Sequence, residues 1–218
     1  MKKGKFGMHK VTKWRWFFFL FGMVIMSLGI TMTIKGQSFG VNSWDVFHIG
    51  LYKNLGLTIG TWSIITGLII VVVTSLVLKS WPKIGTWVNM ILIGSLIDFY
   101  NWLLPDTTIL VGQLAYFIGG LFILGFGCGM YIAPNIGAGP RDSLMIHFVD
   151  KFNLSIKMSR AIIEIVVGLV GWWLGGPLGV GTVILALFTG YVIQYSLVYC
   201  RKLLMYCIGD MEGTKPFY

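Results

Sequence analysis

Six long apolar stretches leave this 218-residue chain few possible folds. They cover about residues 15–35, 60–79, 84–104, 110–133, 158–176 and 178–199. A helix of roughly 20 apolar residues crosses the ~30 Å hydrocarbon core of a bilayer. Only 11% of the residues are charged and 56% are hydrophobic, whereas soluble domains have about 25% and about 45–50%. The sequence therefore predicts an all-α membrane protein with six transmembrane helices.

The positions of lysine and arginine predict how these helices are oriented. If the N-terminus lies inside the cell, 15 of the 17 lysines and arginines fall on the inner side, and only Lys35 and Lys53 lie outside. Such a bias follows the positive-inside rule. We therefore expect two cytoplasmic tails, 1–14 and 201–218. The basic tail 1–14 is expected to contact anionic lipid head groups, and no nucleic-acid partner is expected.

An internal repeat divides the chain into two halves. The segment Gly40–Asp45 recurs 97 positions later as Gly137–Asp142, and Leu57–Ile59 recurs at the same offset as Leu154–Ile156. At an offset of 96, Gly94 and Asp98 correspond to Gly190 and Gln194. Because these matches keep their order, we predict a first repeat over 15–104 and a second over 109–200.

An odd number of crossings in each half determines how the two repeats are related. With three transmembrane helices per repeat, the second repeat must lie upside-down relative to the first. Inverted repeats of this kind are typical of secondary transporters, whose substrate sites lie between the repeats near the middle of the bilayer.

Each predicted repeat contains a short helical element, at 40–56 and at 137–153. Their helical patterns are too short to cross a bilayer, which favours re-entrant or interfacial segments. Non-helical backbone at membrane depth is tolerated where it is buried or lines a cavity. Entering from opposite sides, the two helices would point their positive N-terminal ends at a shared region.

Asp45 and Asp142 occupy equivalent positions in these two elements, and two interpretations remain open. They bind a cation, a proton or an amine group of a solute, or they complement the helix dipole and cap backbone amides. His48 lies three residues after Asp45 on the same helix face, so this pair could also transfer a proton.

The predicted transmembrane helices contain further polar candidates. Glu164 lies in the fifth helix, where it binds an ion or pairs with Arg160 four residues before it. Asp98 lies near the outer end of the third helix, and because its repeat partner Gln194 is also polar, both are expected to face protein or a cavity.

No catalytic or metal-binding motif is recognisable in the sequence. Phosphate-binding loops, zinc-protease helices and nucleophile elbows are missing, and Cys128, Cys200 and Cys207 do not have the spacing of metal ligands. We therefore expect neither enzymatic activity nor a cofactor.

Several segments together resemble the YczE family, part of the YczE/YyaS/YitT group of bacterial integral membrane proteins. The resemblance is carried by Gly40–Leu51, by Gly56–Thr61, by the spacing of Gly85, Thr86, Asn89, Gly94 and Asp98, and by Gly137–Asp142. It implies a protein of the bacterial inner membrane, with no assigned substrate and no catalytic residues.

The sequence thus favours a small secondary transporter that binds a small solute or ion between the short helices. The candidate binding residues are Asp45, Asp142, Glu164, Asp98, His48, Arg141, Gln194 and Asn89. A homodimer is plausible, because so short a chain offers little room for a pathway of its own. The alternative is a membrane scaffold or assembly factor that transports nothing.

Overall fold

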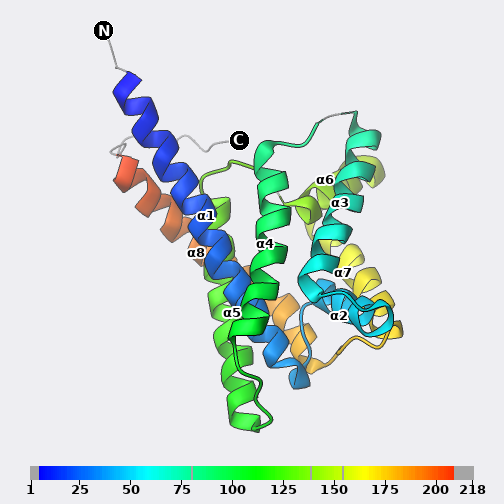
Figure 1. Cartoon of the computed structure of the whole chain (residues 1–218). Coiled ribbons are helices and arrows are strands. Elements are labelled where there is room, and N and C mark those ends of the chain that lie inside the picture. The colour runs from blue at the N-terminus through cyan, green and yellow to red at the C-terminus, as the bar shows by residue number, and fades with distance from the viewer. Residues whose placement is uncertain (1–4, 80, 138, 154, 209–218) are drawn as a thin grey trace.

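The computed structural model describes residues 5–79, 81–137, 139–153 and 155–208. Within these ranges the chain forms eight α-helices and one 3₁₀ turn, and no strand (Figure 1). The elements are α1 (Lys5–Lys35), η1 (Gln37–Phe39), α2 (Ser43–Leu55), α3 (Ile59–Leu78), α4 (Ile84–Leu103), α5 (Leu110–Ile132), α6 (Pro140–Phe152), α7 (Ile156–Trp173) and α8 (Val180–Ile208). The prediction of an all-α protein is confirmed.

Four of the helices are long and apolar enough to cross a membrane. They are α1, α3, α5 and α8, with candidate spans Val11–Lys35, Ile59–Val77, Leu110–Ile132 and Val180–Ile208. Helices α4 and α7 cover the other two predicted stretches but do not reach the same combination of length and hydropathy. Helix α1 begins at Lys5 and α8 continues to Ile208, so both predicted tails are partly helical.

Helix α1 packs antiparallel against α5 along a row of glycines. A Cβ atom at Gly22 would clash with the backbone of Tyr131, and one at Gly29 with that of Leu124. As the residue number increases along α1, the residue number of its contact partner on α5 decreases, so the two helices run in opposite directions. Small residues allow helix backbones to approach closely in membranes, where packing replaces the hydrophobic effect. Side chains of α1, including Phe19 and Met23, form the centre of the core.

The short helices begin and end at residues suited to those positions. Gly40 precedes α2 with φ of 103°, a conformation that favours glycine. Pro140 opens α6, where its missing N–H is no loss. The next helix of each half starts at a hydroxyl N-cap: Thr58 accepts from the Thr61 amide, and Ser155 from that of Met158. The leucine-hydroxyl-isoleucine repeat thus marks two equivalent helix starts.

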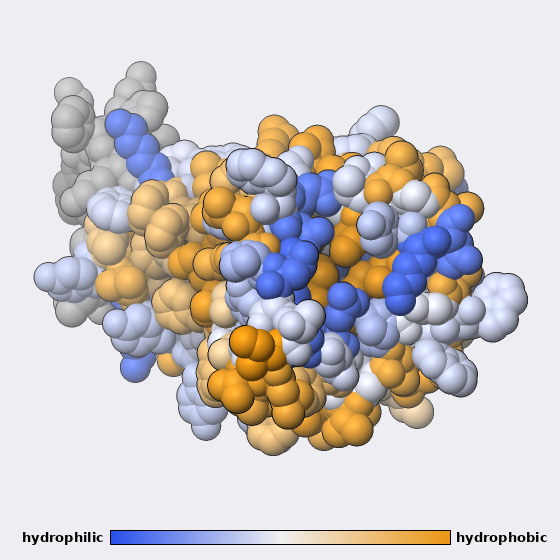
Figure 2. All heavy atoms as spheres, turned by 60° about the horizontal axis from the view of Figure 1, so that its bottom comes forward, coloured by the Kyte–Doolittle hydropathy of each residue, from blue (hydrophilic) through white to orange (hydrophobic). Residues whose placement is uncertain are grey.

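Helices α2 and α6 pack on helices from the other half of the sequence. Helix α2 packs mainly on α7, and α6 packs on α3. At the end of the bundle where α1 ends, Lys35 pairs with Asp106 at 2.6 Å and Lys53 donates to the Gly175 carbonyl. Seen from this end, hydrophilic residues gather near the middle and right of the face among apolar ones (Figure 2).

Candidate functional site

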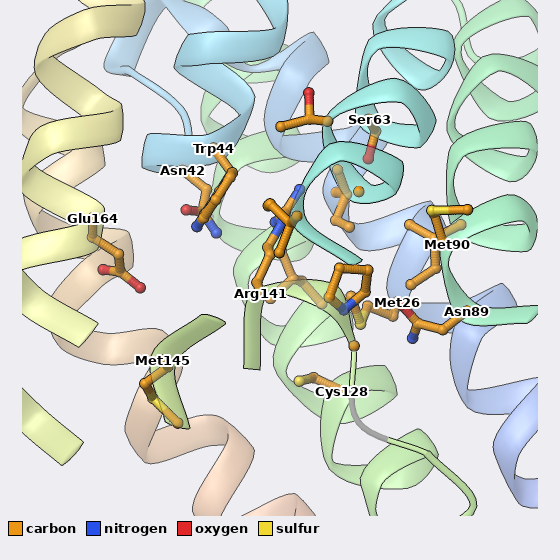
Figure 3. A pocket seen from close by; sticks show the side chains of 18 of the residues that line it. Met26, Asn42, Trp44, Ser63, Asn89, Met90, Cys128, Arg141, Met145 and Glu164 are labelled. Atoms are coloured by element: carbon orange, nitrogen blue, oxygen red, sulfur yellow. The ribbon is translucent and has the colours of Figure 1, made fainter. Parts of the chain in front are cut away.

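A cavity of about 150 Å³ lies where the N-terminal ends of α2 and α6 meet helices of both halves. Besides aliphatic and methionine side chains, its lining contains polar and charged residues from each of the helices α2 to α8, including the N-cap of α2. These are Asn42, His48, Ser63, Thr66, Asn89, Tyr131, Arg141, Arg160, Glu164 and Thr189. Figure 3 shows Asn42, Trp44, Ser63, Asn89, Arg141 and Glu164 around it.

The starts of the two short helices form one wall of this cavity. Asn42 is the N-cap of α2, yet its side chain makes no capping hydrogen bond and lines the cavity instead. Gly139, Pro140 and Arg141 contribute the start of α6. The Arg141 guanidinium carbon lies 4.8 Å from the centroid of the Trp44 ring, within the range of a cation–π interaction.

Two buried polar side chains in the lining have nitrogen atoms without a hydrogen-bond partner. Both ring nitrogens of His48 and Nδ2 of Asn89 are unpartnered. Their exposed fractions are 1% and 4%. Buried polar groups are nearly always hydrogen-bonded, and leaving one unpaired costs about 1–3 kcal/mol. These groups are therefore suited to bind a polar ligand.

Asp45 lies beside the cavity but does not line it. Its carboxylate is 1% exposed, and neither oxygen has a hydrogen-bond partner, so it caps no backbone amide. The nearest basic atom is Nδ1 of His48, at 3.9 Å from Oδ1. The two side chains share a helix face, as their spacing predicts. In this structure His48 and Trp44, the neighbours of Asp45 on α2, form the wall, and a direct contact of Asp45 with a solute stays a prediction.

The side chain of Asp142 lies outside the described residues, although its backbone belongs to α6.

Glu164 lines the cavity as part of an ion pair. Its Oε1 lies 2.9 Å from Nε of Arg160, one turn earlier on α7, and both side chains border the cavity. The pairing interpretation is confirmed, and it places both charges at the site.

Asp98 and Gln194 lie away from the cavity. The Asp98 carboxylate accepts from the Gly60 amide at 2.8 Å and from the Thr58 hydroxyl at 2.5 Å, so it holds the start of α3. Gln194 is exposed on α8. Gln194 therefore makes no comparable buried contact in the single chain, and its predicted role stays a prediction. Asp98 faces protein through this helix-end contact.

Comparison with known proteins identifies the family to which the chain belongs. Residues 13–197 match the family described as "Family of unknown function (DUF6198)". The chain is 41% identical over 195 residues to "Uncharacterized membrane protein YczE" of Bacillus subtilis, covering 89% of this chain and 91% of that protein. The chain belongs to this family.

Two further relatives support the family assignment. An uncharacterized protein of Haemophilus influenzae is 32% identical over 178 residues, covering 82% of this chain and 81% of that protein. "Uncharacterized protein YyaS" of Bacillus subtilis is 25% identical over 183 residues, covering 83% and 90%. No solved structure matches. The resemblance to the YczE family is thus confirmed, and the chain is an integral membrane protein.

For this member of the YczE family, sequence reasoning missed part of the cavity wall. Trp44, Ser63 and Thr66 line it but were not candidates. The 97-residue offset could have found two of them, because it maps Trp44 onto Arg141 and Ser63 onto Arg160. Among the described side chains, no three of His, Cys, Asp or Glu are grouped so that they could hold a metal ion.

Proposed function

We propose that the protein is a small secondary transporter of the bacterial inner membrane, which binds a small solute in the cavity between α2 and α6. In this proposal six helices cross the bilayer in two inverted repeats, and both termini are cytoplasmic. The observation that carries it is the buried polar cavity at the starts of two helices too short to cross the membrane. Secondary transporters with inverted repeats bind substrate at the interface of the repeats, often at the N-terminal ends of short helices.

The glycine row between α1 and α5 supports the inverted repeat. An offset of 98 converts the Gly22–Tyr131 contact into a Gly120–Thr33 contact, and the latter is also present. The same offset converts Gly29–Leu124 into Gly127–Met26, which is present too. Such an exchange is expected when a two-fold axis crosses two antiparallel helices. The N-terminal start of α1 and the C-terminal end of α8 lie at the same end of the bundle (Figure 1), which agrees with an even number of crossings.

The short helices give independent support for this symmetry. Helix α2 packs on α7 and α6 packs on α3, and each pairing becomes the other when the halves are exchanged. Each repeat therefore completes the wall around the other repeat's short helix. A site formed in this way can be opened to either side by moving one repeat against the other.

One pair of helices breaks the symmetry. In the first half α3 packs on α4, where a Cβ atom at Gly94 would meet the Gly60 carbonyl at 2.6 Å. In the second half, within the described residues, α7 and α8 make no comparable contact, and the space around Gly190 is open. Inverted-repeat transporters place their two repeats in different conformations in each state. We infer that this is the state in which the solute enters between α7 and α8, from the cytoplasm.

Flux into proteoliposomes tests the proposed transport function. The full chain is reconstituted with a known orientation, and uptake of a solute panel is measured with and without an ion gradient. Gradient-dependent accumulation of at least one solute, reduced by Asn89→Leu, is the expected result. Leu103→Ala, an exposed position at the end of α4, serves as the control variant.

A protein that does not transport can be distinguished from a protein that was not reconstituted correctly. If the reconstituted protein is monodisperse and correctly inserted, yet no solute crosses and stable protein partners co-purify in mild detergent, the scaffold alternative is correct.

A further inference from the structure

Among the described side chains, the charged groups that line the cavity are two guanidinium groups and one carboxylate, on α6 and α7, and the buried Asp45 carboxylate lies beside it. Arg160 and Glu164 pair with each other, so their charges offset at short range. Arg141 adds a further positive charge at the start of α6. A guanidinium group at this position can bind an anionic ligand.

Backbone geometry at the cavity also favours an anionic ligand. The starts of two 13-residue helices border the cavity, and helix N-termini carry the positive end of the helix dipole. Unpaired amides at such ends favour carboxylate and phosphate groups. The Asn42 side chain leaves its capping position unused and lines the cavity, where its amide can donate to a ligand.

The unpartnered side chains identify the ligand's hydrogen-bonding groups. Nδ2 of Asn89 is a donor with no acceptor, and the two ring nitrogens of His48 have no partner. Both residues are more than nine-tenths buried and line the same cavity as Arg141. A ligand with two oxygens on one carbon would satisfy both Asn89 and the planar guanidinium, which binds carboxylates with two parallel hydrogen bonds.

Trp44 determines how the guanidinium is presented. The Arg141 guanidinium lies over the Trp44 ring at 4.8 Å, which restricts its orientation. Both residues line the cavity, so the ring also offers an apolar surface to the ligand.

The remaining wall sets the size and polarity of the ligand body. Met26, Ile30, Met90, Ile93 and Leu124 contribute apolar surface. The cavity of about 150 Å³ equals the volume that holds one benzene molecule in an engineered apolar core.

We propose that the cavity binds a small monocarboxylate with an apolar body about the size of one six-membered ring, with Arg141 binding the carboxylate. This inference rests on the proposed transport function for its physiological meaning, but the binding site itself can be tested alone.

Benzoate is a suitable probe, with benzamide as its neutral analogue and benzylamine as its cationic analogue. Binding to the full chain in detergent is measured by calorimetry at concentrations up to about 10 mM, which covers the weak affinity expected of so small a ligand. We expect benzoate to bind at least tenfold more tightly than benzylamine. R141Q is expected to weaken benzoate binding at least tenfold, and R141K less, while benzamide binding changes little.

The control variant is K202Q, which removes one positive charge from an exposed position near the end of α8. It should leave benzoate binding unchanged. Equal binding of benzoate and benzylamine, no benzoate binding by the wild-type chain, or unchanged benzoate affinity in folded R141Q and R141K would overturn the proposal.

Binding and flux separate this inference from the proposed function. If benzoate binds in an Arg141-dependent manner but no solute is transported, the anion site stands and the transporter proposal fails. If proteoliposomes accumulate only cations or neutral solutes, the transporter proposal stands and the ligand class is wrong.

Discussion

Arg141 lies over the indole ring of Trp44, with 4.8 Å between the guanidinium carbon and the ring centroid. The two residues hold the same place in the two repeated segments, one before Asp45 and the other before Asp142. Two equivalent positions of a repeat thus meet at one cavity with different side chains. In the inverted repeat that we propose, such positions lie near the two-fold axis, where a single ligand can contact both.

Removing the Trp44 ring should weaken ligand binding through Arg141. A cation–π contact contributes about 0.5–2 kcal/mol, so W44A should lower the affinity for benzoate roughly tenfold, and W44F, which keeps an aromatic face, less. Calorimetry on the purified chain measures both. W172A, at an exposed position on α7, is the control. Equal affinities in W44A and the wild type would show that the ring does not position the guanidinium.

The glycine row of α1 and α5 predicts a sharp difference between two alanine variants. At Gly29 the added methyl group would overlap the backbone of Leu124, so G29A should lower the free energy of unfolding by about 1–3 kcal/mol. At Gly190 nothing lies within 4 Å, and the helix position is regular, so G190A should be neutral or slightly stabilising. Thermal unfolding in one detergent compares them. A G29A variant as stable as G190A would mean that α1 and α5 do not pack as described.

The Asp98 carboxylate predicts a stability effect that its repeat partner should not show. Asp98 accepts hydrogen bonds from the Gly60 amide and the Thr58 hydroxyl at the start of α3. D98A removes both, and losing such an N-terminal contact typically costs about 1 kcal/mol. Q194A, exposed on α8, should change the unfolding midpoint much less. The same experiment measures both variants, and a larger loss in Q194A would contradict this assignment.

The sequence allowed the helices to be predicted more fully than the site. Apolar length and the positions of Thr58 and Ser155 are local signals, so the boundaries of α3 to α7 agree within a few residues, whereas α1 starts earlier and α8 ends later than the apolar stretches indicate. Which side chains meet depends on packing between halves. Asp45 and His48 are neighbours on one helix and were predicted as a pair, but the contact of Trp44 with Arg141 requires α2 and α6 to converge. Gln194 shows the same limit, because its exposure depends on whether α7 approaches α8.

Replacing the buried Asp45 carboxylate should separate ion-coupled accumulation of the solute from its exchange across the membrane. The carboxylate has no hydrogen-bond partner and lies 3.9 Å from His48, so it does not serve as a helix cap. If this pair carries the coupling ion, D45N should reduce gradient-driven accumulation at least tenfold and leave solute exchange without a gradient near the wild-type rate. Proteoliposome uptake and counterflow measure the two processes.

The matched control is D106N, which removes an exposed carboxylate paired with Lys35 at the end of the bundle. It should affect neither process. Full accumulation by D45N would assign Asp45 a purely structural role, which a lowered unfolding temperature of that variant would reveal directly.

The unequal pairing of α3–α4 and α7–α8 predicts two cross-links with different behaviour. In a chain whose Cys128, Cys200 and Cys207 are replaced by alanine, T58C/D98C places thiols where the native side chains are bonded. A short bifunctional thiol reagent should cross-link this pair quickly and stop transport. S155C/Q194C occupies the equivalent positions of the second half and should react slowly, only when α7 approaches α8 in the opposite state.

Thiol labelling after cross-linking tests whether these are two states of one transport cycle. A triple variant combines T58C, S155C and Q194C and keeps Asp98. Cross-linking the S155C and Q194C thiols should trap the opposite state, and the T58C thiol should then react faster with a polar maleimide. In the proposed exchange of conformations, α3 leaves α4 when α7 closes on α8. An S155C/Q194C pair that never reacts, in a protein that transports, would show that the two halves do not exchange conformations.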